Sequence, residues 1–214
     1  MNNEQIIALV DHTLLKAVSS WPEIKKLCEE ALEYHTASVC IPPCFIKRVH
    51  ESFPNLNICT VIGFPLGYNT SEVKLYETKK ALEDGANEID MVINLGLVKE
   101  GRFNEVTKEI ALLKEACKDK ILKVIVETCY LTKEEKIQVC KCVNDAKADY
   151  IKTSTGFGSA GATAEDVILF KENIDPSVKI KAAGGIKTLD DINNLVDAGA
   201  SRLGSSSAIK LLTK

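Results

Sequence analysis

Three lysines recur at equal spacing in the second half of the chain, and their positions favour chemistry over packing. Lys123, Lys152 and Lys181 are each 29 residues from the next, and each falls within a short β-rich run. A buried parallel strand normally reads as a near-continuous apolar stretch, and an ammonium group inside one is costly unless it is paired, solvated or neutral. The three lysines therefore predict a site built around an amine.

The alternation of side chains along a strand predicts which of these groups meet. Residues two apart on a strand share a face, so the polar faces of four consecutive strands carry Asp90, Lys123, Lys152 and Lys181. A cation beside another cation loses its proton more easily, and Lys152 has a lysine on each flanking strand. We therefore expect Lys152 to be a neutral nucleophile, the form of lysine that makes a Schiff base with a carbonyl substrate.

Other interpretations of these lysines stay open. A single inward lysine in a barrel more often belongs to a structural ion pair, although three lysines beside an acid favour a site. The lysines could instead bind anions in a barrel isomerase or transferase acting on a sugar phosphate. They could also belong to a non-catalytic barrel that senses a phosphorylated metabolite. Failure of borohydride to trap an imine would favour the isomerase or transferase. Binding of a ligand without turnover would favour the sensor.

Short β-rich runs alternate with helical patterns about eight times along the chain, as expected of strand–helix units. The predicted strands are Leu9–Asp11, Ser38–Ile41, Ile58–Ile62, Glu88–Val92, Leu122–Glu127, Tyr150–Thr153, Lys179–Ala182 and Arg202–Gly204. Eight such units in one domain most simply close into a (β/α)8 TIM barrel, here a single domain spanning residues 1–214. The alternative is an open doubly wound sheet, but this sequence lacks the G-x-G-x-x-G motif that such a fold carries after its first strand.

Composition narrows the class of protein. The 214 residues carry a net charge of −3, so nothing favours nucleic acid as a partner, and no apolar run is long enough to span a membrane. The 8 cysteines form no C-x-x-C pair, and the N-terminus lacks the pattern of a signal peptide. With only 3 histidines, a metal-dependent lyase is disfavoured. We expect reduced thiols and a cytoplasmic location.

Glycine-rich turns follow the last three predicted strands. Barrels frequently bind phosphate through backbone N–H groups after the seventh and eighth strands. Glycine permits close approach of the backbone, and serine adds hydroxyl donors. The three turns are Thr155-Gly156-Phe157-Gly158, Gly184-Gly185-Ile186 and Gly204-Ser205-Ser206-Ser207, and their joint placement after adjacent strands favours phosphate as a ligand.

The strings that carry these residues closely resemble the deoxyribose-phosphate aldolase family over about Leu9 to Ile209. The matching segments are Asp11–Lys16, Ser38–Pro43, Gly63–Gly67, Glu88–Val92, Lys123–Thr128, Tyr150–Phe157 and Lys181–Ile186. The resemblance implies a class I aldolase that needs no metal and no cofactor. Its reaction is reversible cleavage of 2-deoxy-D-ribose 5-phosphate to acetaldehyde and D-glyceraldehyde 3-phosphate, in the salvage of deoxynucleosides. Members are commonly homodimers or homotetramers.

The resemblance also implies roles for individual residues. Lys152 matches the Schiff-base lysine, Lys181 the second lysine that tunes it, and Asp90 the acid that shares proton transfer. The residues that match the lining of the substrate pocket are Asp11, Thr13, Cys40 and Lys123. The residues that match the phosphate site are Gly156, Gly184, Gly185, Gly204, Ser206 and Ser207.

The chain departs from the family pattern at two places. Phe157 stands where some members carry a lysine after the sixth strand, so one phosphate-binding cation is absent. Some members end in a tail that finishes with tyrosine and assists a proton step, whereas this sequence ends in Leu212-Thr213-Lys214. We expect that assistance to be missing or supplied by another group.

Overall fold

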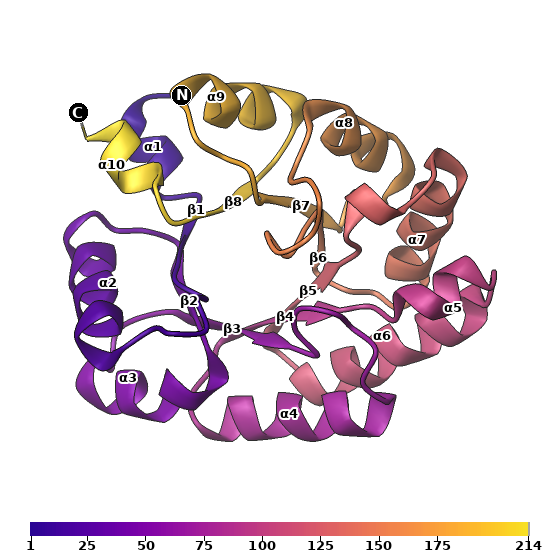
Figure 1. Ribbon diagram of the computed structural model, residues 1–214, viewed down its shortest axis with the longest axis horizontal. Coiled ribbons are helices and arrows are strands. Elements are labelled where there is room, and N and C mark those ends of the chain that lie inside the picture. Colours follow the sequence, from indigo (N-terminus) through magenta and orange to yellow (C-terminus); the bar gives the residue numbers. More distant parts are fainter. Residues whose placement is uncertain (214) are drawn as a thin grey trace.

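The computed structural model describes residues 1–213, in which eight parallel strands close into a barrel inside a ring of helices (Figure 1). The strands follow one another in sequence order, and β1 pairs with β8 to close the sheet. The strands are β1 (Val10–Thr13), β2 (Ser38–Ile41), β3 (Ile58–Ile62), β4 (Glu88–Val92), β5 (Ile121–Ile125), β6 (Tyr150–Lys152), β7 (Lys179–Ala183) and β8 (Arg202–Ser205). The predicted TIM barrel is confirmed, and the open doubly wound alternative is wrong.

Helices occupy the connections between the strands and the two ends of the chain. The α-helices are α1 (Asn3–Ile7), α2 (Trp21–Glu33), α3 (Ile46–Ser52), α4 (Ser71–Glu83), α5 (Leu95–Lys99), α6 (Phe103–Cys117), α7 (Lys133–Asp145), α8 (Ala164–Asn173), α9 (Leu189–Ala198) and α10 (Ala208–Leu212). Two short 3-10 helices are η1 (Pro43–Phe45) and η2 (Thr128–Tyr130). Lys214, the last residue of the predicted domain and of the terminal segment, lies outside the described residues. Within residues 1–213, no helix combines the length and the apolar character needed to cross a bilayer.

Each predicted strand is present, with ends that agree to within two residues. The largest differences lie at the end of β1, which continues to Thr13, and at the end of β5. Strand β5 stops at Ile125 instead of Glu127, because Glu127 has a left-handed backbone with φ of 51°. A non-glycine residue in this region is uncommon and costs about 1–2 kcal/mol. The turn after β5 is therefore held by other contacts, which belong to the site described below.

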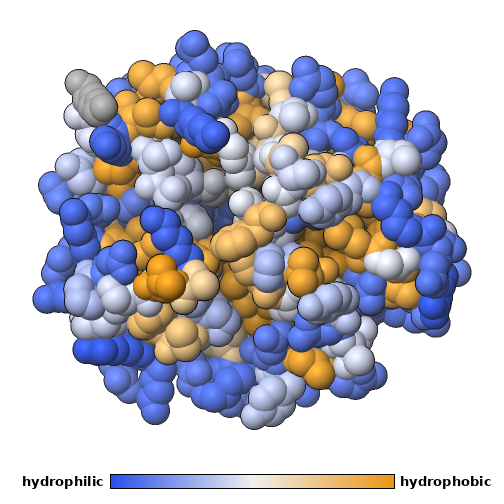
Figure 2. Space-filling view, viewed as in Figure 1, coloured by the Kyte–Doolittle hydropathy of each residue, from blue (hydrophilic) through white to orange (hydrophobic). Residues whose placement is uncertain are grey.

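The alternation along the strands sorts the barrel into an apolar outside and a polar inside. Outward-facing residues such as Ile89, Met91 and Val124 are fully buried beneath the helices and join the main hydrophobic core. Inward-facing residues include Asp90 and Lys123, which are also fully buried. Hydrophilic side chains dominate the outline of the molecule in Figure 2. Because the charged groups inside the barrel are buried away from solvent, each needs a hydrogen-bond or ion-pair partner there.

The strand register shows which lysines are neighbours. Lys152 pairs with Lys181 on β7, as predicted, but on β5 it pairs with Ile125. Lys123 pairs with Asp90 and Tyr150, one layer lower in the barrel. Lys123 therefore lies on the flanking strand β5, as predicted, but one layer below Lys152 and not directly opposite it. Strands in a closed barrel are staggered, so equal spacing in sequence does not place residues at equal height.

Candidate active site

A layer of charged side chains fills the barrel below its C-terminal mouth. Its carboxylates come from β1 and β4, and its basic groups come from β5, β6, β7 and β8. The members are Asp11, Glu88, Asp90, Lys123, Lys152, Lys181 and Arg202.

Asp90 lies at the centre of this layer and accepts hydrogen bonds from all three lysines. Its Oδ2 accepts from Lys152 Nζ at 2.7 Å and from Lys181 Nζ at 2.6 Å. Its Oδ1 accepts from Lys123 Nζ at 2.8 Å and from Cys59 Sγ at 3.1 Å. One carboxylate therefore links the amine predicted to react with the amine predicted to assist it.

The other acids pair with the basic groups that lie deeper. Glu88 Oε2 is 2.5 Å from Lys123 Nζ, and Asp11 Oδ2 is 2.5 Å from Lys181 Nζ. Arg202 Nη1 closes the ring, at 2.6 Å from Asp11 Oδ1 and 3.1 Å from Glu88 Oε2. Lys123 thus pairs with three carboxylates, the third being Asp11 at 3.4 Å, and Lys181 pairs with two, whereas Lys152 pairs only with Asp90.

Protonation follows from these contacts. Burial alone would lower the pKa of Lys181, but Asp11 and Asp90 outweigh it and hold that pKa above its usual value. The same two acids raise the pKa of Lys123 well above normal against the effect of burial. Burial would raise the pKa of Asp90, but Lys123, Lys152 and Lys181 hold it well below its usual range. Asp90 is therefore a carboxylate, and the two deep lysines are firmly protonated.

The count of charges leaves one cation in excess, since four basic groups face three carboxylates. A buried cluster with excess positive charge favours loss of one proton. Lys123 and Lys181 are fully buried and each pairs with more than one carboxylate, whereas Lys152 is 3% exposed and borders an open cavity. Lys152 is thus the amine of this layer that borders the cavity.

The cavity above Lys152 has a volume of about 240 Å³ and is formed by the loops that follow β1, β6, β7 and β8. The predicted site residues that line it are Thr13, Lys152, Gly156, Gly184, Gly185, Gly204 and Ser206. Asp11, Asp90, Cys40, Lys123 and Lys181 are buried in or beside the charged layer beneath it. Ser207 supports the β8 turn, because its hydroxyl donates to Ile186 O at 3.2 Å and its N–H donates to Ser205 Oγ.

Glycine backbones form the end of the cavity predicted to bind phosphate. Gly184 has φ of 80°, and the β6–α8 loop approaches it so closely that a Cβ on Gly161 would lie 2.2 Å from Gly184 O. Within residues 1–213, the backbone N–H groups of Gly156, Gly185 and Ser206 have no hydrogen-bond partner. Free N–H groups lining a cavity are suited to binding an anion.

Two aromatic rings meet at the mouth of the cavity. Phe64, from the β3–α4 loop, and Phe157, from the β6–α8 loop, pack edge to face with ring centroids 5.3 Å apart. Phe157 also lines the cavity. At position 157, where some members of the family carry a charged lysine, this chain therefore has an apolar contact between two loops.

Glu127 explains the left-handed turn after β5. Its buried carboxylate accepts a hydrogen bond from the Thr155 hydroxyl, and the Thr155 N–H donates to its Oε1 at 3.2 Å. Thr155 Oγ1 in turn accepts from Phe157 N at 3.0 Å. Glu127 therefore positions the loop that contributes Gly156 and Phe157 to the cavity.

Replacement of Glu127 tests both the contact and the strain. Hydrogen bonds to a charged group contribute about 1.5–3 kcal/mol, so we expect Glu127→Ala to lower the free energy of unfolding by about 3 kcal/mol. Glu127→Gly loses the same carboxylate but accepts a positive φ freely, so it should be about 1 kcal/mol more stable than the alanine variant. Urea denaturation measures both. Equal losses in the two variants would contradict a strained backbone at this position.

Comparisons with known proteins identify the family of this chain. Residues 5–210 match the model of the DeoC/LacD family aldolase. The chain belongs to the DeoC/LacD aldolase family. A deoxyribose-phosphate aldolase of Clostridium botulinum (strain Alaska E43 / Type E3) is 61% identical over 213 residues, covering 99% of this chain and 96% of that one. One of Clostridioides difficile (strain 630) is 51% identical over 210 residues, covering 98% and 96%.

A solved structure agrees in fold as well. The deoxyribose phosphate aldolase of Aeropyrum pernix, described as having a unique tetrameric structure, superposes with a TM-score of 0.89 at 32% identity. The match covers 99% of this chain and 91% of that one. The resemblance inferred from the sequence strings is thereby confirmed at the level of the family.

Thiols and carboxylates in this aldolase also come close enough to suggest metal ligands. Cys40, Cys59 and Asp90 offer ligand atoms within 4.8 Å of one another, as do Asp11, Cys59 and Glu88. The acids in both groups already pair with lysine ammonium groups. A metal ion here would have to displace one of those cations. Burial raises the pKa of Cys59 well above normal, which keeps its thiol protonated.

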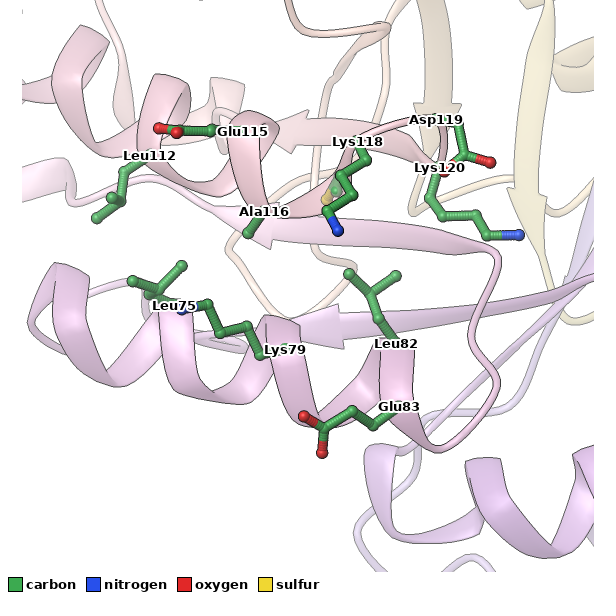
Figure 3. A pocket seen from close by; sticks show the side chains of 11 residues that line it. Leu75, Lys79, Leu82, Glu83, Leu112, Glu115, Ala116, Lys118, Asp119 and Lys120 are labelled. Atoms are coloured by element: carbon green, nitrogen blue, oxygen red, sulfur yellow. The ribbon is translucent and has the colours of Figure 1, made fainter.

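A larger hollow of about 600 Å³ lies outside the barrel, between α4 and α6 (Figure 3). Leucines from both helices line it, including Leu75, Leu82 and Leu112. Its lysines and acids are equal in number, three of each: Lys79, Lys118, Lys120, Glu83, Glu115 and Asp119. This hollow therefore offers neither the buried amine nor the excess charge of the barrel cavity.

The sequence-based prediction assigned no role to four residues that the structure brings into or beside the site. Glu88 and Arg202 balance the charged layer, Glu127 positions a loop, and Lys16 lines the cavity. Glu88 could have been found, since it shares a strand face with Asp90. Arg202 could have been found as a basic residue at the start of β8. Lys16 and Glu127 lie in segments that match the family, Asp11–Lys16 and Lys123–Thr128, but no local pattern indicates what either residue contacts.

Proposed function

We propose that this chain is a deoxyribose-phosphate aldolase that cleaves 2-deoxy-D-ribose 5-phosphate through an imine on Lys152. The observation that carries the proposal is the position of Lys152, which lies at the floor of a cavity, shares Asp90 with Lys181, and faces glycine-rich turns with free N–H groups. Membership of the DeoC/LacD aldolase family supports the reaction class.

In the cleavage direction, neutral Lys152 attacks the aldehyde carbon of the open-chain sugar. The carbinolamine loses water to give a protonated imine, which draws in the electrons of the C2–C3 bond. The C3 hydroxyl loses its proton, and glyceraldehyde 3-phosphate leaves. The remaining enamine takes a proton at C2, and hydrolysis releases acetaldehyde and regenerates the amine. The electron pair of the C2–C3 bond thus moves toward the imine nitrogen on cleavage and returns to C2 when the enamine is protonated.

Asp90 and Lys181 are the groups we assign to the proton transfers. Asp90 contacts both amines through one oxygen atom, at 2.7 Å from Lys152 and 2.6 Å from Lys181. A proton can therefore pass between Lys152 and Lys181 through the carboxylate of Asp90. General acid–base assistance of this kind contributes about 10²–10⁴-fold to a rate.

A coupled enzyme assay tests the proposal. It measures the formation of glyceraldehyde 3-phosphate from 2-deoxyribose 5-phosphate, with a chelator present. We expect turnover that the chelator leaves unchanged. Absence of turnover in the folded protein would overturn the proposed substrate, and loss of turnover with the chelator would overturn a metal-independent imine mechanism. Borohydride trapping then separates the aldolase from an isomerase whose lysines only bind anions.

The phosphate end of the cavity gives a separate prediction. Ser206 is exposed and lines the cavity, so Ser206→Ala should remove a hydroxyl donor and raise KM for the phosphorylated sugar about three- to tenfold, the effect of one hydrogen bond of 0.5–1.5 kcal/mol. Steady-state kinetics with unphosphorylated 2-deoxyribose is the control. Equal damage with both sugars would contradict a phosphate contact at Ser206.

We further propose a homodimer or homotetramer working in the cytoplasm on this small phosphorylated sugar. All eight cysteines are free thiols, as is typical of a reducing compartment, and the Aeropyrum pernix relative is described as tetrameric. Light scattering on a sizing column measures the mass in solution. A mass equal to one chain of 23.4 kDa would contradict the oligomer.

A further inference from the structure

Among the described residues that line the cavity above Lys152, only two carry ionisable side chains, and both are lysines: Lys152 and Lys16. The rest of the lining is apolar, glycine or hydroxyl-bearing. A cavity with two basic groups and no acid in its wall attracts an anion. Lys152 is held by Asp90 at 2.7 Å and is the amine assigned to the imine. Lys16 has no role in that chemistry.

The closed barrel explains how Lys16 comes to this cavity. The loop after β1 carries Lys16, and β1 pairs with β8 in a register that places His12 opposite Ser205. The loops that leave these strands are therefore neighbours, and Thr13 to Lys16 line the cavity together with Gly204 to Ser206. Lys16, near the start of the sequence, thus lines the same cavity as the serine turn near its end, which is predicted to bind phosphate.

The turn that carries Lys16 is ordered by its own hydrogen bonds. Lys16 O accepts from Ser19 N at 3.0 Å and from the Ser19 hydroxyl at 2.7 Å. The nearby acid is Glu23, whose carboxylate accepts from the backbone and hydroxyl of Ser20 at 2.8 and 2.6 Å. These hydrogen bonds from Ser20 lower the pKa of Glu23 more than Lys16 does. Both hydrogen bonds reach Oε2 of Glu23, and among residues 1–213 Lys16 forms no ion pair with this or any other carboxylate, so its ammonium group is available to a ligand.

We propose that Lys16 is the cation that pairs with the phosphate group of the substrate, an inference that rests on the proposed aldolase function. The loops after β6, β7 and β8 contribute Phe157, Gly184, Gly185 and Ser206 to the cavity, none of them charged. Backbone N–H groups and a hydroxyl would orient the phosphate oxygens, and Lys16 would neutralise their charge. Contacts between a charged donor and phosphate are about twice as strong as neutral hydrogen bonds.

Kinetics with matched substrates tests the proposal. For Lys16→Gln we expect KM for 2-deoxyribose 5-phosphate to rise about tenfold, with kcat changed less than about twofold, because the contact lies away from the reacting carbon. The kcat/KM for unphosphorylated 2-deoxyribose should stay within about twofold of wild type. Lys16→Arg, which keeps the charge, should restore most of the affinity. Equal losses with both sugars, or no rescue by arginine, would overturn the assignment.

Two further variants control for position. Lys79→Gln removes the same charge from the hollow between α4 and α6 and should leave KM unchanged. Lys187→Gln removes a charge from the loop after β7, where the side chain does not line the cavity. A rise in KM for Lys187→Gln, with none for Lys16→Gln, would move the phosphate cation to Lys187 and sink the proposal.

Binding of inorganic phosphate separates this inference from the proposed function. Phosphate should raise the melting temperature of the wild-type protein, and Lys16→Gln should need about ten times more phosphate for the same shift. Added salt should weaken phosphate binding more strongly in wild type than in the variant. If wild type binds phosphate through Lys16 but cleaves neither sugar, the aldolase proposal fails and the anion site stands. Equal phosphate binding by both proteins would overturn the anion site alone.

Discussion

Lys152→Ala is expected to lower kcat for cleavage of 2-deoxyribose 5-phosphate by about 10⁴-fold or more, while the protein stays folded. The rate falls because no other amine borders the cavity floor to form the imine, and removal of a covalent nucleophile typically has an effect of this size. Stability should change little, since the charged layer holds one basic group in excess and Lys152 is the member with a single carboxylate partner. The coupled assay measures the first effect and urea denaturation the second.

Covalent trapping provides the complementary readout. Borohydride reduction in the presence of acetaldehyde should add one ethyl group to the peptide that carries Lys152, and Lys152→Arg should abolish the label. Lys181 is the matched control, because it lies beside Lys152 and contacts the same oxygen of Asp90 but is fully buried and firmly protonated. A label on Lys181 or Lys123 in place of Lys152 would refute the assignment of the nucleophile.

Asp90→Asn is expected to reduce both stability and activity. The carboxylate pairs with three lysines, so its neutral replacement leaves Lys152 with no carboxylate partner and Lys123 and Lys181 each with one fewer. Breaking a buried ion pair in this way costs about 3–5 kcal/mol. We also expect kcat to fall by about 10²–10⁴-fold, the usual contribution of a general acid–base group. Urea denaturation and steady-state kinetics at neutral pH measure the two losses.

The pH dependence of that stability loss follows from the pKa of Asp90. The lysines hold this pKa well below its ordinary value, so the stabilisation is fully present above about pH 4, the pKa of an aspartate in an unfolded chain. It is lost as pH falls below that value. The difference in unfolding free energy between wild type and Asp90→Asn should therefore be constant from neutral pH down to about pH 5 and shrink in more acidic solution.

Glu88→Gln is the control that separates stability from catalysis. Glu88 pairs with Lys123 and Arg202 in the same layer but does not contact Lys152. We expect a stability loss similar to that of Asp90→Asn, with kcat reduced much less. If Glu88→Gln lowers kcat as far as Asp90→Asn does, the activity loss reflects damage to the whole layer. In that case Asp90 has no special part in proton transfer.

Much of the barrel followed from local patterns. Short β-rich runs that alternate with helical patterns marked the strands and helices, and the structure shows local signals at their ends. For example, the capping pair Thr132 and Glu135 opens α7, and Gly199, with φ of 122°, follows α9. The helices form where their first turns are capped, and the barrel closes because each strand is followed by a helix that must cover the sheet. Such signals act within a few residues, so they can be read from the sequence.

The identity of the central groups was also accessible from the sequence. Lysines and an acid inside apolar strands are rare enough to indicate a site, and strand alternation put Asp90, Lys152 and Lys181 on the inner face. The partners of these groups were less accessible. Glu88 shares a strand face with Asp90, but its pairing with Lys123 and Arg202 depends on the height of each residue in the staggered barrel.

The sequence by itself therefore determined which residue types enter the barrel, and on which face of each strand they lie. Only the tertiary structure decided their neighbours: it placed Lys123 one layer below Lys152, brought Lys16 from the start of the chain to the same cavity as the serine turn at its end, and tied Glu127 to the loop after β6. The physical reason is closure. A closed, staggered sheet sets contacts between distant segments, and electrostatic pairing inside it depends on distances of a few ångströms that no local pattern encodes.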